Sequence, residues 1–277
     1  MSKNSNLLVN NPNGQCNLVP LYEGKMIHQY DYHWASYQDG NIRKVALTEK
    51  RDPSYQLIPR YWVDKTKVES WFSGKQNKKW IIAFRDITKS TNERTALFSL
   101  LPKVAVNDTV TLLLTTTYQT SLISCLLGCL NSLVFDFVVR QKVGGVYLGI
   151  FIMKQLPVLP PNRFSEEDIS YISSRVLELT YTSWEMKPFA EDMGYEGEPF
   201  IWDEERRAKL RAELDAYYAK LYGLTRDELR YILDPKDVYG ENFPSETFRV
   251  LKENEIQQYG EYRTQRLVLS AWDKLNA

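Results

Sequence analysis

The first part of the chain alternates short apolar runs with turn residues, and this pattern predicts strands. The runs WIIAF (80–84), VAV (104–106) and VTLLLTTT (110–117) have the length and composition of buried strands. The Gly144–Gly145 pair supplies a turn, after which YLGIFI (147–152) re-enters a strand pattern. The chain from about residue 18 to 159 therefore predicts a mixed α/β module.

The longest apolar stretch, SLISCLLGCLNSLVFDFVV at residues 121–139, is interrupted by Asn131 and Asp136. Both side chains are costly in lipid, so the stretch does not predict a membrane span. It predicts one buried core helix that ends near Arg140.

Past residue 161, helix signals dominate. Ser165 with Asp168, and Thr225 with Glu228, have the spacing of an N-cap and its N3 acid, and Asp203 precedes an acidic first turn. Each marks a helix start. Two more helical patterns follow, one after residue 245 and one from about residue 261 to the end.

The helix after Asp203 carries an apolar stripe that stops at Gly223. Its members recur at spacings of four, three and four, and are Leu210, Leu214, Tyr217 and Leu221. This stripe predicts that the helix packs against the rest of a helical subdomain.

A stiff connector separates the two parts, because LPVLPP (156–161) can continue neither a helix nor a strand. The N-terminal stretch MSKNSNLLVNNPNG is polar and has no apolar run of signal-peptide length. We therefore expect a flexible leader (1–17), an α+β domain with a short-stranded sheet and a buried helix (18–161), and an α-helical C-terminal subdomain (162–277).

Composition is that of a globular protein, with 43% hydrophobic and 25% charged residues among 277. The three cysteines, Cys16, Cys125 and Cys129, are few and odd in number, which favours a reducing compartment, with the cytoplasm as the expected location. Cys125 and Cys129 can share a helix face and are expected to pack in a core. The two histidines, His28 and His33, lack the spacing of a helical metal pair.

Motifs for autonomous catalysis are absent from the sequence. It has no phosphate-binding Gly-x-x-x-x-Gly-Lys-Ser/Thr, no Gly-x-Ser-x-Gly and no Cys-x-x-Cys. It also lacks the Gly-rich cofactor loop and the (Asn/Asp/Ser)-Pro-Pro-(Tyr/Phe) tetrapeptide of amino-group methylases, and no carboxylate cluster with a nearby lysine indicates a nuclease. No catalytic or metal-binding residue is assigned, and the chain is not expected to be an enzyme on its own.

The net charge is zero overall, but the charges are not evenly distributed. Residues 1–160 hold 19 Lys and Arg against 11 Asp and Glu, and residues 161–277 hold 16 against 24. This asymmetry suggests a nucleic-acid-facing module joined to one that faces solvent or protein. The alternative is chance segregation of surface charge.

Cations and aromatic residues are interleaved between residues 43 and 94. The stretch includes Arg43, Lys44, Lys50, Arg51, Arg60, Tyr61, Trp62, Lys65, Lys67, Trp71, Lys75, Lys78, Lys79, Trp80 and Arg85. Cations can neutralise phosphates while aromatic planes pack on sugars or bases, as on nucleic-acid-binding surfaces. The alternative is a solvated face whose aromatic residues belong to the core.

The segment RDITKSTNERT (85–95) follows a predicted buried strand and carries the side-chain types that contact base edges. Arg recognises guanine, Asn adenine and Glu cytosine. The alternative is local: Thr91 or Asn92 caps a following helix, with Glu93 in its first turn and Arg94 paired nearby.

Five groups of residues, in order along the first domain, and further groups in the tail resemble one family. In the first domain they are LYEGKMIHQYD (21–31), FRDI (84–87) with TNERT (91–95), LPKV (101–104), RQKVGG (140–145) and KQLPVLPP (154–161). In the tail they are PFA (188–190), WDEERR (202–207), LDP (233–235), FRVLK (248–252) and YGEYRT (259–264). From about residue 18 to the end, the chain resembles the C-terminal part of large adenine-specific DNA methyltransferases of bacterial restriction-modification and phage-defence systems, with their TaqI-like target-recognition domain.

The resemblance implies a module that recognises a duplex DNA sequence while a catalytic domain extrudes an adenine and methylates its N6. That catalytic half, which would bind S-adenosylmethionine, has no counterpart here, so a methyltransferase domain or subunit is the expected partner. A second hypothesis is a protein-interaction module that docks a catalytic partner and clamps DNA without sequence preference.

On the first hypothesis, two sets of residues contact DNA. The groove contacts are expected from Arg85, Lys89, Asn92 and Arg94, and the phosphate contacts from Arg43, Lys44, Lys75, Lys78, Lys79, Arg140 and Lys142. Replacing Arg94 by Ala is then expected to lower specific affinity by ~1–3 kcal/mol.

Overall fold

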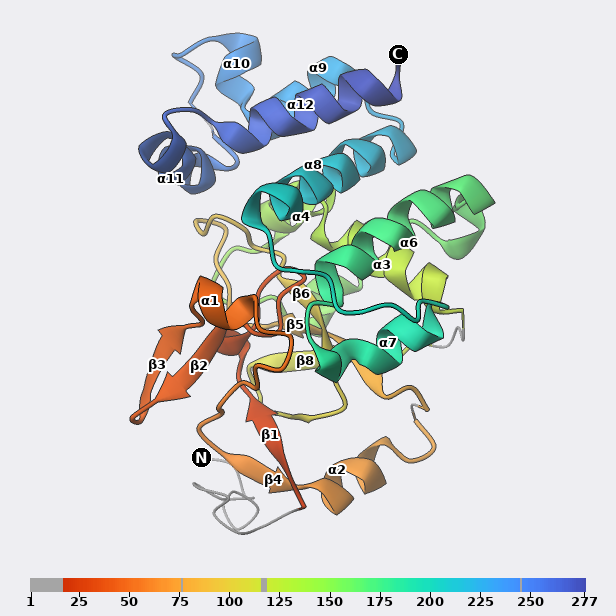
Figure 1. Ribbon diagram of the computed structural model, residues 1–277. Coiled ribbons are helices and arrows are strands. Elements are labelled where there is room, and N and C mark those ends of the chain that lie inside the picture. The colour runs from red at the N-terminus through yellow and green to blue at the C-terminus, as the bar shows by residue number, and fades with distance from the viewer. Residues whose placement is uncertain (1–16, 76, 116–118, 245) are drawn as a thin grey trace. The chain divides into compact units, whose positions relative to one another are not determined.

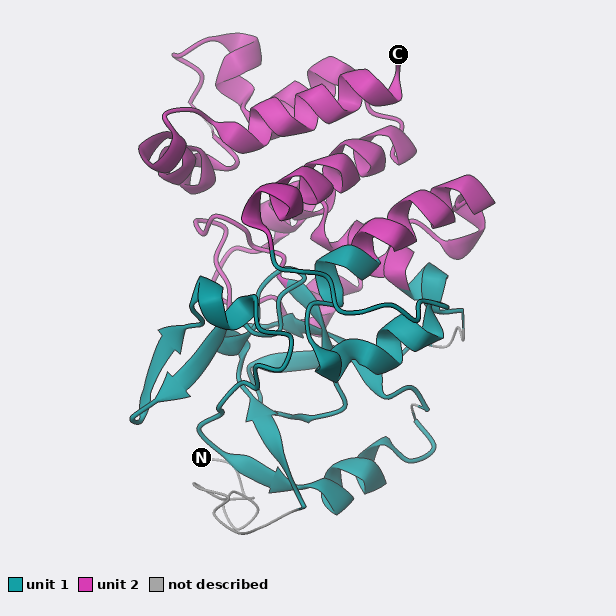
Figure 2. Ribbon diagram, in the orientation of Figure 1, with its two compact units in different colours: residues 1–86, 98–123, 177–202 teal, residues 87–97, 124–176, 203–277 magenta. Residues whose placement is uncertain are grey.

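A computed structural model describes residues 17–75, 77–115, 119–244 and 246–277 (Figure 1). The chain divides into two compact units, drawn teal and magenta in Figure 2. Unit 1 comprises residues 1–86, 98–123 and 177–202, and unit 2 comprises residues 87–97, 124–176 and 203–277. Of the predicted leader, residues 1–16 lie outside the described residues.

Unit 1 contains every strand found in the described residues. Its elements are β1 (Leu18–Tyr22), η2 (Gly24–Met26), β2 (Ala35–Gln38), β3 (Asn41–Lys44), α1 (Leu47–Lys50), β4 (Trp62–Asp64), α2 (Lys65–Phe72), β5 (Trp80–Arg85), β6 (Phe98–Pro102), β7 (Ala105–Val106), β8 (Val110–Leu113), η4 (Trp184–Met186) and α7 (Lys187–Asp192). The helices α3 (Thr120–Asn131) and α6 (Glu166–Thr180) pass from one unit to the other along the chain.

Three small sheets organise unit 1, with strand orders β4-β1-β7, β2-β3 and β6-β5-β8. In the last, β5 lies between two antiparallel partners, and Ile82 faces Leu100 on one side and Leu113 on the other. The residues of β5 are buried except Arg85, which is why its sequence is a continuous apolar run. The predicted buried strand at 80–84 is confirmed, whereas the one at 104–106 is reduced to β7, whose two residues are half-buried.

The predicted strand at 110–117 is shorter in the structure, because β8 ends at Leu113. Leu114 and Thr115 carry no strand pairing, and Leu114 is exposed. Residues 116 and 117 lie outside the described residues.

Unit 2 is helical. Its elements are α4 (Leu133–Lys142), α5 (Ile150–Met153), η3 (Pro161–Arg163), α8 (Glu204–Leu221), α9 (Arg226–Leu233), α10 (Pro235–Tyr239), α11 (Arg249–Tyr259) and α12 (Arg263–Leu275). Together the two units confirm the predicted α+β class, and unit 2 confirms helices in the C-terminal part of the chain.

The three predicted helix starts are correct. Asp203 accepts a hydrogen bond from the backbone of Arg206 at the start of α8, and Thr225 forms a capping box with Glu228 at the start of α9. Ser165 likewise exchanges hydrogen bonds with Asp168 just before α6. These signals are local, so the sequence alone suffices to place them.

The core of unit 2 lies among α4, α8, α9 and α12. Ala212, Ala216 and Ala219 form a small-residue face on α8 that packs with Val268 and Trp272. Side chains this small let another helix approach closely. The predicted stripe on α8 is also buried at Leu210, Leu214 and Tyr217, whereas Leu221 is half-buried.

The predicted single core helix at 121–139 is wrong in one respect: the chain breaks at Ser132 into α3 and α4, which meet at 55°. Ser132 is extended (ψ 151°), and its hydroxyl accepts from Phe135 N at the start of α4. Asp215 of α8 accepts from Leu133 N at 2.7 Å. Two capping acceptors thus stabilise a new helix start in mid-sequence.

No single helix in the described ranges is long and apolar enough to cross a membrane. α3 and α4 meet those requirements only as a bent pair, by length and composition. Both consist largely of buried residues.

The predicted strand at 147–152 is wrong. Tyr147 forms a single antiparallel bridge with Ile87, and the chain then enters the one-turn helix α5. From Gly149 onward the backbone bonds are local, because Met153 N donates to the Gly149 carbonyl at 3.1 Å. A single pairing residue on the neighbouring segment does not sustain a strand, and the helical turn satisfies the backbone instead.

The compact units do not follow the predicted boundary at residue 161, since residues 124–176 all belong to unit 2. The connector is attached to its surroundings: Leu156 is buried, and Tyr222, the C-cap residue of α8, donates to the Pro157 carbonyl at 2.7 Å. Residues 177–202 return to unit 1, where Trp184 N donates to the Pro53 carbonyl at 3.0 Å.

Candidate functional site

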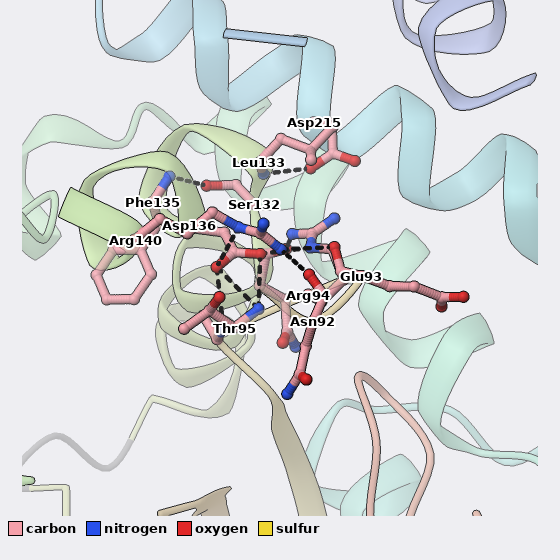
Figure 3. Close-up of polar contacts among 12 residues, drawn as sticks. Asn92, Glu93, Arg94, Thr95, Ser132, Leu133, Phe135, Asp136, Arg140 and Asp215 are labelled. Atoms are coloured by element: carbon pink, nitrogen blue, oxygen red, sulfur yellow. Dashed lines mark hydrogen bonds and ion pairs between the residues drawn. The ribbon is translucent and has the colours of Figure 1, made fainter. Parts of the chain in front are cut away.

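A buried carboxylate holds the segment after β5, residues 87–97, within unit 2. Asp136, in the first turn of α4, is fully buried and accepts from Arg94 Nε at 2.8 Å. It also accepts from the backbone N–H groups of Thr95 and Ala96, at 3.0–3.1 Å (Figure 3). One side chain therefore fixes three consecutive residues. We call residues 87–97 the anchored loop.

The break at Ser132 explains why a carboxylate can be buried at this point. A helix N-terminus presents unpaired N–H groups and a positive dipole end, both of which favour a nearby anion. Arg94 adds a full positive charge, and its Nη2 donates to the Asn131 carbonyl at 2.6 Å. Removing one partner of such a buried pair typically costs about 3–5 kcal/mol.

Arg140 lies one turn further along α4. Its side chain binds backbone carbonyls of the anchored loop. Its guanidinium donates to four carbonyls, those of Ser90, Asn92, Glu93 and Thr247, at 2.6–2.9 Å. Burial lowers the pKa of Arg140. The group stays charged near neutral pH, because arginine side chains are not deprotonated in proteins. Only a planar group with several diverging donors can bind so many acceptors at once.

The structure corrects the assignment of Arg94 and Arg140 as DNA contacts. Their side chains are 10% and 5% exposed and are engaged with Asp136 and with backbone carbonyls. Both are positioning residues that hold the anchored loop. The sequence left open that Arg94 pairs locally, but its carboxylate partner Asp136 lies 42 residues further along the chain.

The anchored loop presents other predicted residues. Lys89 and Thr91 are exposed, and Asn92 and Glu93 are half-buried. In Figure 3 the side chains of Asn92 and Glu93 extend away from Asp136. No helix follows Asn92, because the loop leads directly into β6, so the alternative of a helix cap at residue 91 or 92 is wrong. Lys142, at the end of α4, is also exposed.

In unit 1, two of the predicted phosphate-binding cations are bound to neighbouring carboxylates. Arg43 donates to Glu49 at 2.6 and 2.7 Å, and this pairing lowers the pKa of Glu49. Lys78 lies 3.2 Å from Asp192 and donates to Thr120 at 2.8 Å. Both remain cationic, but each charge is partly balanced by a neighbour.

The other predicted cations of unit 1 are more accessible. Lys44, Lys75 and Lys79 are exposed. Arg85 ends β5 and is half-buried, and burial lowers the pKa of its guanidinium. Their positions follow from the fold, since Lys44 ends the β3 edge strand and Lys79 directly precedes β5.

The aromatic residues interleaved with these cations divide into two kinds. Trp80 belongs to the core and donates from Nε1 to Asp192 at 2.8 Å, as the core alternative predicts. Trp71 is 49% exposed, and the Lys75 ammonium lies 4.1 Å from its ring centroid. An exposed ring beside a cation is the arrangement that can contact a nucleic acid.

A buried polar cluster in unit 1 was not foreseen from the sequence. Lys50 forms an ion pair with Asp31, and its ammonium lies 4.2 Å from the ring centroid of Trp202. His33 Nε2 lies 2.8 Å from a carboxylate oxygen of Glu185, which is 152 residues away. Because the partners are distant along the chain, no local pattern indicates the cluster.

Cys125 and Cys129 pack in the core as predicted, both fully buried. Burial raises the pKa of the Cys125 thiol to about 12. Among the described residues, no group of three or more His, Cys, Asp and Glu side chains is arranged to hold a metal ion.

No protein-family model, curated protein or solved structure matches this chain.

Proposed function

We propose that the chain is the target-recognition part of an N6-adenine DNA methyltransferase of a restriction-modification or phage-defence system. It binds duplex DNA in a sequence-dependent manner. Methylation is supplied by a methyltransferase domain or subunit outside this chain, and S-adenosylmethionine binds there. The cytoplasm, where such a system meets DNA, is part of this proposal.

The observation that carries the proposal is the anchored loop. Reading base edges requires side chains held at fixed positions, because a mobile loop loses affinity to the entropy of ordering. Asp136 and Arg140 fix this loop through main-chain groups and leave Lys89 exposed and Asn92 half-buried at its surface. Its residue types suit direct contact with guanine and adenine.

The remaining cations account for sequence-independent affinity. Lys44, Lys75, Lys79 and Lys142 are exposed, and Arg43, Lys78 and Arg85 are partly exposed. Contacts to phosphate fix the register of a protein on DNA, whereas base contacts select the sequence. Arg94 and Arg140 contribute indirectly, by holding the loop.

The test is selection from a randomised duplex pool by the purified full chain at several salt concentrations, with the bound DNA sequenced. Enrichment of an adenine-containing motif is the expected result. A sequence-specific DNA-binding protein prefers its site over other sequences by roughly 10³-fold or more. Absence of any duplex binding at low salt would refute the proposal.

The second candidate, a docking module with a loose DNA clamp, is supported by the acidic composition of residues 161–277, which hold 24 acidic against 16 basic residues. The same selection separates the two functions. A clamp binds with steep salt dependence but enriches no sequence, because phosphate contacts carry no sequence information.

A further inference from the structure

Unit 2 exposes a cluster of apolar side chains between α4 and η3. Phe151 of α5 is 81% exposed and Ile150 is 57% exposed, and Val146 and Tyr147 just before them are each 53% exposed. Large apolar side chains grouped on a surface mark a binding site more often than singly exposed ones do. We call these four residues the apolar tip.

The apolar tip is held on a fixed support. Leu148 and Leu156 are buried on either side of α5. Tyr147 bridges to Ile87 at the start of the anchored loop, where Thr88 N donates to the Val146 carbonyl at 3.1 Å. The backbone of the apolar tip is therefore joined directly to the start of the anchored loop.

The charge around the apolar tip indicates what it binds. No Asp or Glu occurs between Asp136 and Glu166, whereas Lys142 and Lys154 flank the tip along the chain and are exposed. Lys89, two residues after Ile87, is exposed as well. Apolar side chains flanked along the chain by cations suit a polyanion that also offers apolar surfaces. Stacked bases between phosphates are such a target.

We propose that Phe151, supported by Ile150, is a wedge that enters between stacked bases of duplex DNA while Lys142 and Lys154 contact the flanking phosphates. Apolar side chains inserted at a base step unstack it and kink the duplex. This inference rests on the proposed function and deepens it, because unstacking a step reduces the energy needed to extrude a neighbouring base.

The experiment uses the full chain and duplexes carrying 2-aminopurine at successive positions, since this base becomes more fluorescent when it unstacks. We expect wild-type protein to raise the fluorescence at one step. Phe151→Ala should abolish that rise and weaken binding about 10-fold or more, with an unchanged salt slope. Phe151→Trp should restore the fluorescence rise.

Two variants serve as controls. Ile201→Ala removes an apolar side chain that is 80% exposed in unit 1 and should leave both readouts unchanged. Lys142→Ala should weaken binding and lower the salt slope, but keep the fluorescence rise at saturating protein. Thermal unfolding midpoints should agree among all variants, because each substituted side chain is exposed.

The failures of the two proposals are distinguishable. If wild-type protein does not bind duplex DNA, the proposed function fails and the wedge with it. If wild-type protein binds but Phe151→Ala matches it in affinity and fluorescence, the proposed function stands and the wedge is overturned. A dimer in solution that dissociates on Phe151→Asp would also overturn it, by showing that a second copy covers the apolar tip.

Discussion

Arg140 donates from Nη2 to the backbone carbonyl of Asn92 at 2.6 Å, although 48 residues separate the two in the chain. The contact uses the main chain of Asn92 and leaves its side chain for other partners. The position of a candidate base-reading residue thus depends on an arginine that need not touch DNA. Effects on folding and on recognition can therefore be separated by substitution.

Replacing Asp136 by Asn should destabilise the protein by about 3–5 kcal/mol, because Arg94 then keeps a buried charge without its anion. Unfolding by urea measures the loss. The matched control is Asp227→Asn, since Asp227 is 77% exposed and pairs with Arg230 at the surface. That change should cost no more than about 1 kcal/mol. Similar losses for the two variants would contradict the role of Asp136.

Arg140→Lys should destabilise the protein by about 2–4 kcal/mol despite the conserved charge, because an ammonium cannot satisfy four diverging carbonyls. Backbone amides of the anchored loop should also exchange with solvent faster, which hydrogen-exchange measurements report. Lys142→Ala, at an exposed position on the same helix, should change neither quantity. Unaltered exchange in Arg140→Lys would show that the loop is held by other contacts.

Asn92→Ala should lower affinity for a selected DNA sequence by about 1–3 kcal/mol and leave affinity for scrambled DNA nearly unchanged. Lys79→Ala should weaken binding to both and reduce the salt slope by about one. Salt-titrated binding to the two duplexes measures both effects. Equal losses on selected and scrambled DNA for Asn92→Ala would show that Asn92 does not contact bases.

For Arg94→Ala, the structure changes the expectation. The sequence alone predicts a loss of DNA affinity, whereas the buried ion pair predicts that the variant also loses stability.

Stability should depend on pH through Asp215, because burial raises the pKa of this carboxyl to about 6 in the folded protein. The unfolded chain releases the same proton near a pKa of about 3.9. The contribution of Asp215 to stability is therefore fully present below about pH 4 and is lost as the pH rises through about 6.

Asp215→Asn removes this dependence while keeping an oxygen that can accept from Leu133 N. Relative to wild type, the variant should gain about 2–3 kcal/mol of stability between about pH 4 and about pH 7. Urea unfolding of both proteins at the two pH values measures the difference. If the difference in unfolding free energy between wild type and variant does not change with pH, burial does not raise the pKa of Asp215.

The structural features that depend only on neighbouring residues could be predicted from the sequence. The capping pairs at Asp203 and Thr225 and the apolar run of β5 are set within a few positions, so they could be predicted. The break at Ser132 depends partly on Asp215, which lies 82 residues beyond Leu133, and its hydrogen bond has no local signature.

The predicted site residues divide in the same way. Lys44, Lys79, Lys89 and Lys142 are exposed, as expected for surface cations, whereas Arg94 was predicted from residue type alone. Its partner Asp136 is 42 residues away and inside an apolar stretch, where an acid by itself indicates only that the stretch does not span a membrane. An acid within an apolar helix sequence is the one signal that could have indicated a buried partner for an arginine.

On the proposed function, the attachment of the anchored loop determines how its DNA preference can change. Asp136 and Arg140 bind mainly N–H and carbonyl groups of the loop, and those groups are present whatever side chain the residue carries. Positions 89, 91 and 92 can therefore vary without loss of support, provided the backbone path is kept. On the proposed function, a library randomised at these three positions is a source of variants with altered DNA preference.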